Sequence, residues 1–299
     1  MMKEFLNGKF HKVMEYCKER AHVSFFHEAG SALFDFPDSF LALDKEKLNG
    51  ALASMRKAGE RANQYRRKTG IVGYLVRGDF TNYTDTELHA ELIFAVTELM
   101  TGLLIILADQ SIYGAVNACI KAKSSYSSFK NCEYALEDKL EWESEISRQN
   151  LEAGTCLGIG GFDLILSFCP TVVTRILDYV GFNSDRLDAL AKLKRCIENQ
   201  ETIFFEVCAI SMTVYHAFLS YFYGIGELNE PFFELCSQRW SISQTNIEII
   251  NVGRGSRDLV LGKPDTAIEY FNATLSGTSK LSYPQLNYVC YWQLTWAHV

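Results

Sequence analysis

Three glycines near the middle of the sequence are the first residues whose type and spacing could bind a ligand. Gly158, Gly160 and Gly161 precede an apolar stretch, and glycines before a helix N-terminus are typical of loops that bind phosphate. Such a loop also needs a preceding strand and either a third glycine or a Lys-Ser/Thr pair at the helix start. Here the third-glycine position holds Asp163, and the preceding segment, 133–149, reads as a charged helix. We therefore predict a turn into a buried helix.

Histidine beside a carboxylate could bind a metal ion or act as a general base. His27-Glu28 is not followed by the second histidine of an H-E-x-x-H motif, which zinc binding on one helix face requires. His89-Ala90-Glu91 has no P-C-x-x-C downstream, unlike the zinc deaminases. The sequence also lacks a G-x-S-x-G motif and the local context of a catalytic cysteine. We therefore name no catalytic, metal-binding or cofactor-binding residue, and we expect no cofactor.

Acidic residues follow one edge of an otherwise apolar segment, 85–108. On a helix they fall within about 40° of one another, and they are Glu87, Glu91, Glu98 and Asp109. No Glu-x-x-His motif accompanies them, so a metal site of the helix-bundle type is not indicated. We predict a helix that is buried between its neighbours, with one hydrated edge that could pair with the basic end of the preceding helix.

That basic end is a cluster of cations within the predicted helix 44–68. Its members are Arg56, Lys57, Arg61, Arg66, Arg67 and Lys68. The cluster could meet a phosphate, an acidic lipid headgroup or an acidic partner helix. Cations near a helix C-terminus also oppose the helix dipole, so we favour a solvated helix end. The formal net charge of −7 argues against a general nucleic-acid binder.

Composition and cysteine use indicate a folded intracellular protein. Of the 299 residues, 48% are hydrophobic and 22% charged, which is ordinary for a globular chain. The nine cysteines include no C-x-x-C pair, so we predict reduced core residues and a cytoplasmic location. The segment 203–226 is apolar enough to suggest a membrane span, but polar residues share one stripe along it. They are Thr202, Glu206, Thr213 and Ser220, and they favour a buried helix over a span.

The spacing of apolar residues and of prolines predicts a helical chain. The five prolines are widely spaced, where they can separate long helices. The predicted helices are 8–19, 22–36, 44–68, 85–108, 111–129, 131–150, 162–179, 184–199, 202–223, 232–251, 265–276 and 283–298.

Local signals after the glycines mark a helix end and a new helix start. Pro170 should end or kink the apolar helix, because proline removes a backbone N–H and clashes with the preceding turn. Gly181 fits a helix C-terminus. One of Asn183, Ser184 and Asp185 can then cap the next helix.

Two segments near the ends of the chain echo each other, 8–17 and 262–271. Both match the inner half of a tetratricopeptide repeat, where a glycine turn is followed by a small residue and then an aromatic. The residues between them show no clean period of about 34 residues. We therefore predict an all-α fold, with tetratricopeptide-like helical hairpins stacked as a solenoid and an irregular helical middle. It would form a single repeat-like domain over 1–299, with repeat units near 1–36 and 253–299.

The sequence as a whole resembles the tetratricopeptide-repeat protein 39 family, which is related to fungal inclusion-body clearance proteins of the mitochondrial outer membrane. The resemblance covers nearly the whole chain and is most specific over 162–193. It implies a helical, non-enzymatic protein whose relatives are tied to lipid homeostasis, cilia or organelle surfaces. The segments that carry it are FLNGKFHKVMEYC, TDTELHAELIFAV, KAKSSYSSFKNC, TCLGIGGFDLILSFCP, GKPDTAIEYF and CYWQLTWAHV.

Family members are longer, so the resemblance also implies a chain that is incomplete at both ends. Tyr288, Trp292 and Trp296 form an aromatic stripe at i, i+4 and i+8, and we expect it to lack a packing partner within the chain.

The leading functional hypothesis is an intracellular interaction scaffold or adaptor that holds a protein partner in a groove between helices. The alternative is a lipid- or sterol-handling helical protein at an organelle surface, motivated by the apolar segments 92–107 and 203–223 and by the basic cluster. An enzyme whose site is assembled from separate helices is the third. We expect no nucleic acid and no small-molecule substrate. Peripheral membrane contact and a ciliary location remain alternatives to a purely cytoplasmic one.

Overall fold

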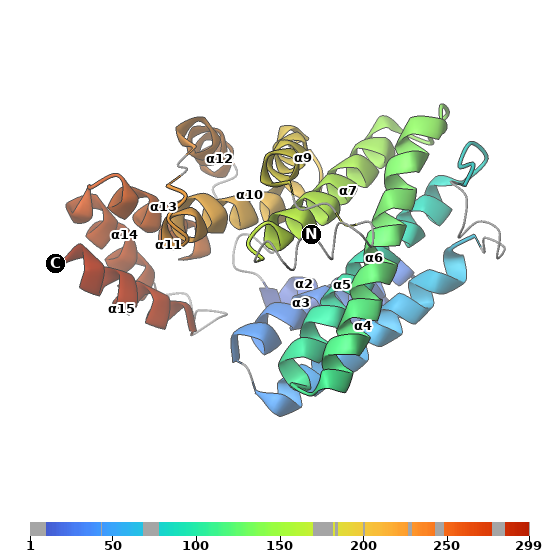
Figure 1. Cartoon of the computed structure of the whole chain (residues 1–299), viewed down its shortest axis with the longest axis horizontal. Helices are drawn as coiled ribbons and strands as arrows, with labels where there is room; N and C mark the ends of the chain where they lie inside the picture. The colour runs from blue at the N-terminus through green and yellow to red at the C-terminus, as the bar shows by residue number, and fades with distance from the viewer. Residues whose placement is uncertain are drawn as a thin grey trace. The chain divides into compact units, whose positions relative to one another are not determined.

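The computed structural model describes most of the chain, and among the residues that it describes there is no β-strand. These residues form α-helices and one π-helical stretch (Figure 1), so the all-α prediction is confirmed. The described residues are 10–42, 44–67, 78–169, 182, 185–199, 201–226, 229–242, 248–276 and 285–298.

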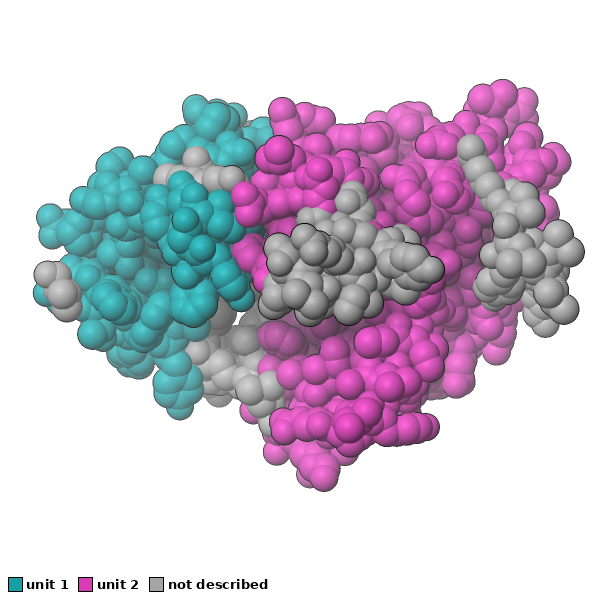
Figure 2. Space-filling model, viewed as in Figure 1, with its two compact units in different colours: residues 1–16, 206–299 teal, residues 17–205 magenta. Residues whose placement is uncertain are grey.

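The helices fall into two compact units, coloured separately in Figure 2. Unit 2 is Cys17–Phe205, and unit 1 is Met1–Tyr16 with Glu206–Val299. A single domain over 1–299 stays a prediction, and each unit is described by itself below.

Unit 2 is a set of helices in which neighbours along the chain pack together. Helix α3 packs on α4, α4 on α5, α5 on α6, α6 on α7 and α7 on α9. Its helices are α3 (Phe25–Ala42), α4 (Lys45–Tyr65), α5 (Asp85–Ala108), α6 (Ile112–Asp138), α7 (Glu145–Leu166) and α9 (Arg186–Glu198). Helix α2 (Phe10–Arg20) crosses the boundary between the units.

Side-chain caps explain where the helices of unit 2 begin. Thr84 forms a capping box with Glu87, in which each side chain binds the other's backbone N–H. Asp185 accepts hydrogen bonds from the backbone N–H groups of Leu187 and Asp188, so the predicted cap is confirmed. Helices α4, α6 and α7 begin in the same way, at Asp44, Ser111 and Ser144.

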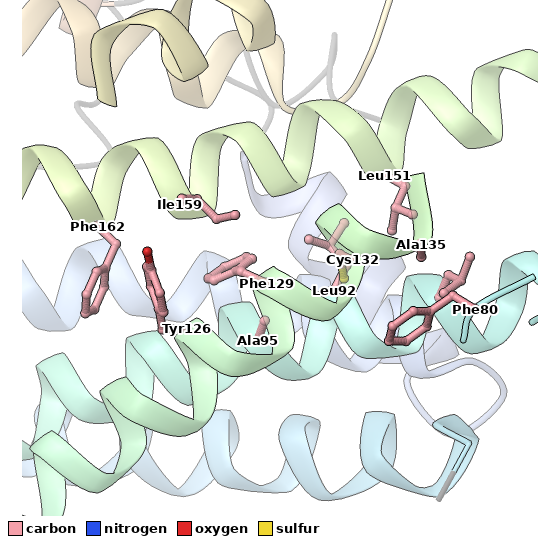
Figure 3. Close-up of a cluster of buried hydrophobic side chains, with 11 residues drawn as sticks. Phe80, Leu92, Ala95, Tyr126, Phe129, Cys132, Ala135, Leu151, Ile159 and Phe162 are labelled. Atoms are coloured by element: carbon pink, nitrogen blue, oxygen red, sulfur yellow. The ribbon is translucent and has the colours of Figure 1, made fainter. Parts of the chain in front are cut away.

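The main core of unit 2 lies where α5, α6 and α7 meet (Figure 3). Leu92 of α5, Phe129 of α6 and Ile159 of α7 are all fully buried there. Figure 3 shows Phe162 and Tyr126 side by side at one end of this cluster, with ring centroids 5.3 Å apart. Phe80, just before α5, closes the other end.

The glycine cluster lies inside α7, and the predicted turn was wrong. The predicted break near residue 130 was also wrong, because α6 runs on to Asp138 and α7 begins only at Glu145. Glycine costs about 1 kcal/mol relative to alanine in a helix interior. Close packing offsets that cost, since a Cβ at Gly158 would overlap the ring of Phe129. A Cβ at Gly154 would lie 2.6 Å from Leu92 Cδ2.

Pro37 lies within α3, so that helix extends past its predicted end at residue 36. The proline removes one backbone N–H there without ending the helix. Pro170 and Gly181 lie outside the described residues.

Unit 1 continues the helical pattern. Its helices are α10 (Phe205–Val214), the π-helical turn η2 (Tyr215–Leu219), α11 (Ser220–Phe222), α12 (Glu230–Ile242), α13 (Glu248–Val260), α14 (Pro264–Ser276) and α15 (Gln285–Ala297). The single helix predicted for 232–251 was wrong: α12 ends at Ile242, and α13 runs well past residue 251.

Helices α13 and α14 form a hairpin with the predicted repeat spacing. Gly262 lies in the turn with a φ of 70°, a conformation that favours glycine. Ala267 and Phe271 are fully buried, and a Cβ at Gly255 would come within 2.5 Å of the Phe271 ring. The glycine, small-residue and aromatic spacing therefore places Phe271 in the hairpin core. Helix α15 packs against both α13 and α14.

Candidate functional site

Most cations of the basic cluster form ion pairs within unit 2. They are Lys57, Arg61, Arg66 and Arg67. Arg66 Nε lies 2.5 Å from Glu91 Oε2, and Arg66 Nη2 lies 2.8 Å from Glu91 Oε1. Arg67 Nε lies 3.1 Å from Glu87 Oε1. The predicted pairing of the acidic edge with the preceding helix is confirmed at these two residues. Asn131 also donates to Glu91, over 3.1 Å.

Other members of the two charged groups are paired elsewhere. Lys57 and Arg61 both approach the buried carboxylate of Glu28, at 2.7 and 3.4 Å. Lys121 Nζ lies 2.8 Å from Glu98. These cations therefore have carboxylate partners, which weakens the case for an anion-binding site.

Two of the remaining charged residues, Asp109 and Arg56, are described by the structure. Asp109 accepts a hydrogen bond from the backbone N–H of Ser111. Arg56 is exposed, and Lys68 lies outside the described residues.

The histidine motifs do not assemble a metal site within the part of the chain that the structure describes. His89 Nε2 lies 3.0 Å from the hydroxyl of Ser147, and its ring meets Phe26 edge-on at 6.1 Å. Burial lowers the pKa of His89, which favours a neutral ring. Nearby Asp85 opposes that shift. The arrangement is a half-buried polar contact between α5 and the first turn of α7.

Asp163 does not face a phosphate site. It is fully buried in the last turns of α7. Burial raises the pKa of Asp163 to about 7, and the Lys192 ammonium partly opposes the rise. The carboxyl is therefore a core group next to α9, where a Cβ at Gly160 would lie 2.9 Å from the Ala189 carbonyl.

The polar stripe of segment 203–226 is buried, as predicted. Its members Thr202, Glu206, Thr213 and Ser220 are each less than a tenth exposed. Among the described residues, the helix long and apolar enough to cross a membrane is instead α5. In α5 56% of the apolar window is buried within the protein, which is typical of a core helix.

A shallow pocket at the turn between α6 and α7 was not anticipated. We call it the Trp142 pocket; its cavity is about 420 Å³. It is lined by Thr81, Asn82, Tyr83, Thr84, Asp85, Lys139, Glu141, Trp142 and Glu143. The one sequence signal was a tryptophan flanked by glutamates at 141 and 143, a pattern that carries no motif.

The aromatic stripe of α15 is exposed in unit 1. Tyr288, Trp292 and Trp296 are 75%, 46% and 60% exposed. The expectation that the stripe lacks any partner was wrong at one position, because the Trp292 ring meets Phe218 edge-on at 5.6 Å. Phe218 also stacks on the exposed ring of Phe222. We call these five residues the aromatic face.

The opposite side of α15 is packed. Cys290 is fully buried, and Gln293 donates a hydrogen bond to Ser256 of α13 over 3.2 Å. The sequence of α15, QLNYVCYWQLTWA, contains no charged residue. The helix therefore combines one face bound to the hairpin with an uncharged aromatic face.

Comparison with known proteins decides the family. A family model described as Iml2/Tetratricopeptide repeat protein 39 matches residues 1–299. The chain belongs to this family. A curated relative, tetratricopeptide repeat protein ttc-39B of Caenorhabditis elegans, is 26% identical over 304 residues, covering 98% of this chain and 51% of the relative. The chain thus spans about half the length of this relative. No solved structure matches this chain.

Membership confirms the resemblance and fits the observed helical hairpins. The family name points to repeats that generally mediate protein–protein contacts. None of the nine cysteines forms a disulfide bond, and seven of them are buried. The prediction of core residues was wrong at Cys119, which is exposed, and at Cys169, which is half-buried.

Proposed function

We propose that this protein is a non-enzymatic interaction scaffold that holds a helical segment of a partner protein on the aromatic face of unit 1. The observation that carries the proposal is the exposure of Tyr288, Trp292 and Trp296 on a helix without charged residues. Soluble proteins seldom leave large contiguous apolar surfaces open unless these surfaces bind something.

The spacing of the aromatic face suits a helix as the bound element. Residues at i, i+4 and i+8 lie on one side of a helix, and ridges of this kind pack into the grooves of a second helix. Tryptophan and tyrosine are also the side chains that most often dominate binding energy at protein interfaces. An amphipathic partner helix with an apolar stripe would match this surface.

A reducing compartment suits the proposed scaffold. None of the nine cysteines forms a disulfide bond, and Cys119 is exposed. An exposed thiol persists most readily in the cytosol. We therefore propose a cytoplasmic location, and fractionation of tagged protein under native conditions tests this proposal.

Site-specific photo-crosslinking tests the function. Trp292 is replaced by benzoylphenylalanine, which keeps an aromatic ring, and Glu269, exposed on α14, is replaced in the same way as the control. We expect a discrete protein adduct from position 292 and none from position 269. Trp296→Gln should abolish that adduct.

Mass spectrometry of the adduct identifies the class of partner. The crosslinked peptide should carry apolar residues at helical spacing. An adduct to lipid would support the lipid-handling alternative instead. Equal adducts from both positions, or none from position 292, would refute the scaffold proposal.

A further inference from the structure

An apolar stripe on the first half of α6 is exposed in unit 2. We call it the α6 stripe, and its members are Ile112, Tyr113, Val116 and Ile120. These side chains are between 54% and 85% exposed, and they fall within an arc of about 100° around the helix. No charged residue lies between Asp109 and Lys121. The stripe is therefore an uncharged apolar surface along its whole length.

Neighbouring helices pack on other sides of α6. The Ser125 hydroxyl donates to the Ala95 carbonyl of α5 over 2.7 Å. Farther along the helix, the Tyr126 ring packs beside Phe162 of α7. Helices α5 and α7 thus bury other faces of α6, while the α6 stripe faces solvent.

The α6 stripe matches itself when two copies of the helix run antiparallel about Val116. Residues at equal distances before and after Val116 then face each other across the two-fold axis. Ile112 lies four residues before it and Ile120 lies four residues after it, so each isoleucine of one copy meets the other isoleucine of the second copy. A two-fold interface requires this kind of self-match, because the same surface is used on both sides.

Charges beyond the two ends of the stripe fit the same arrangement. Exposed Asp109 lies seven residues before Val116, and exposed Lys123 lies seven residues after it. The Lys123 ammonium also lies 5.1 Å from the centre of the Phe182 ring, a contact that leaves the residue exposed. An antiparallel pair brings opposite charges to the same end of the interface, whereas a parallel pair would bring like charges together.

We infer that α6 pairs with α6 of a second copy of this chain, antiparallel and through the α6 stripe. Its four side chains expose on the order of 500 Å², a large part of the roughly 800 Å² that each partner buries in a standard interface. The net charge of −7 makes two copies repel each other, so an uncharged surface is where they can meet. The stripe lies in unit 2, so this inference is independent of the aromatic face.

Cysteine crosslinking tests the antiparallel register in the full chain. Cys119→Ser first removes the exposed native thiol, and Val116→Cys then places a thiol at the two-fold axis. Mild oxidation should link this variant into a dimer, because a disulfide forms when two thiols face each other at short range. Ser127→Cys is the matched control at an exposed position on the same side of α6. Its two copies would lie about 33 Å apart in the antiparallel pair, so no disulfide should form.

Sedimentation over a concentration series measures the equilibrium. The chain carries Trp292→Gln and Trp296→Gln, so that the aromatic face does not contribute. It should still form a dimer, which closes at two chains. Val116→Glu should weaken this dimer at least about hundredfold, because two like charges would meet at the axis. Ser127→Glu makes the same kind of charge change outside the stripe and should leave the dimer unchanged.

Circular dichroism checks that both glutamate variants remain helical. A monomer throughout the concentration series would overturn the inference, and flotation of that monomer with phosphatidylcholine vesicles would assign the stripe to a lipid surface instead. Equal losses of dimer in the two glutamate variants would also overturn it. So would equal crosslinking from positions 116 and 127.

Discussion

The backbone of Gly158 lies directly against the ring of Phe129, so no side chain fits between α7 and α6 at this point. Gly161, three residues later in the same helix, has open space where its Cβ would be. The two glycines therefore offer opposite tests of one helix.

Gly158→Ala should lower the free energy of unfolding by about 1–3 kcal/mol, because the added methyl group overpacks the core. Gly161→Ala should raise it by up to about 1 kcal/mol, through helix propensity alone. Chemical denaturation of both variants measures the difference. Similar effects in the two variants would show that α7 does not pack as described.

Asp163 should make stability depend on pH. Burial raises the pKa of this carboxyl to about 7 in the folded protein, from an ordinary 3.8. The folded state then holds the proton more tightly than the unfolded state, so this contribution to stability is fully present below a pH of about 3.8 and is lost as the pH rises to about 7. Lys192 and Lys130 oppose the shift, whereas Asp188 adds to it.

Asp163→Asn removes that titration while keeping the shape of the side chain. Relative to the original chain, the variant should gain about 2 kcal/mol at a pH of about 8 and less at about 5. Thermal melts across this range provide the measurement. A gain that does not change with pH would contradict the assignment.

The bidentate pair of Arg66 and Glu91 should matter far more to stability than an exposed pair. Both side chains are mostly buried, so Glu91→Gln leaves an unmatched guanidinium and should cost about 3 kcal/mol. Glu145→Gln breaks an exposed pair with Arg148 and should cost less than about 0.5 kcal/mol. Urea denaturation of the two variants tests the contrast, which equal losses would rule out.

The aromatic face should bind hydrophobic dyes and promote self-association of the purified chain. Trp292→Gln combined with Trp296→Gln should suppress both effects, since the exposed rings supply the apolar surface. Thr295→Gln alters an exposed position of the same helix and serves as the control. Dye fluorescence and light scattering report the result. A monodisperse original chain that binds no dye would contradict the prediction.

Local signals were enough to predict most helix starts, but they failed for α7 and α13. Asp185 caps its helix because a cap acts on the next two or three residues. The glycines of α7 were interpreted as a turn because their packing partners, such as Phe129, lie on another helix. The predicted helix 232–251 stopped just before Gly253 and Gly255, whose packing partners Thr213 and Phe271 also lie on other helices.

The same distinction applies to the functional surfaces. The aromatic stripe of α15 was visible in the sequence because its residues follow one helical period. The Trp142 pocket was missed because its two halves are far apart in the sequence, with Asp85 and Glu143 separated by 58 positions. Only the packing of α5 beside the turn after α6 brings them together.

The π-helical turn Tyr215–Leu219 sets the rotational phase of everything that follows it in its helix. An ordinary α-helix turns about 100° per residue, whereas a π-helical turn holds an extra residue and turns less per residue. The turn therefore changes the direction in which Phe222 points, relative to an uninterrupted α-helix that continues from α10. The aromatic face depends on this backbone geometry as well as on its aromatic side chains.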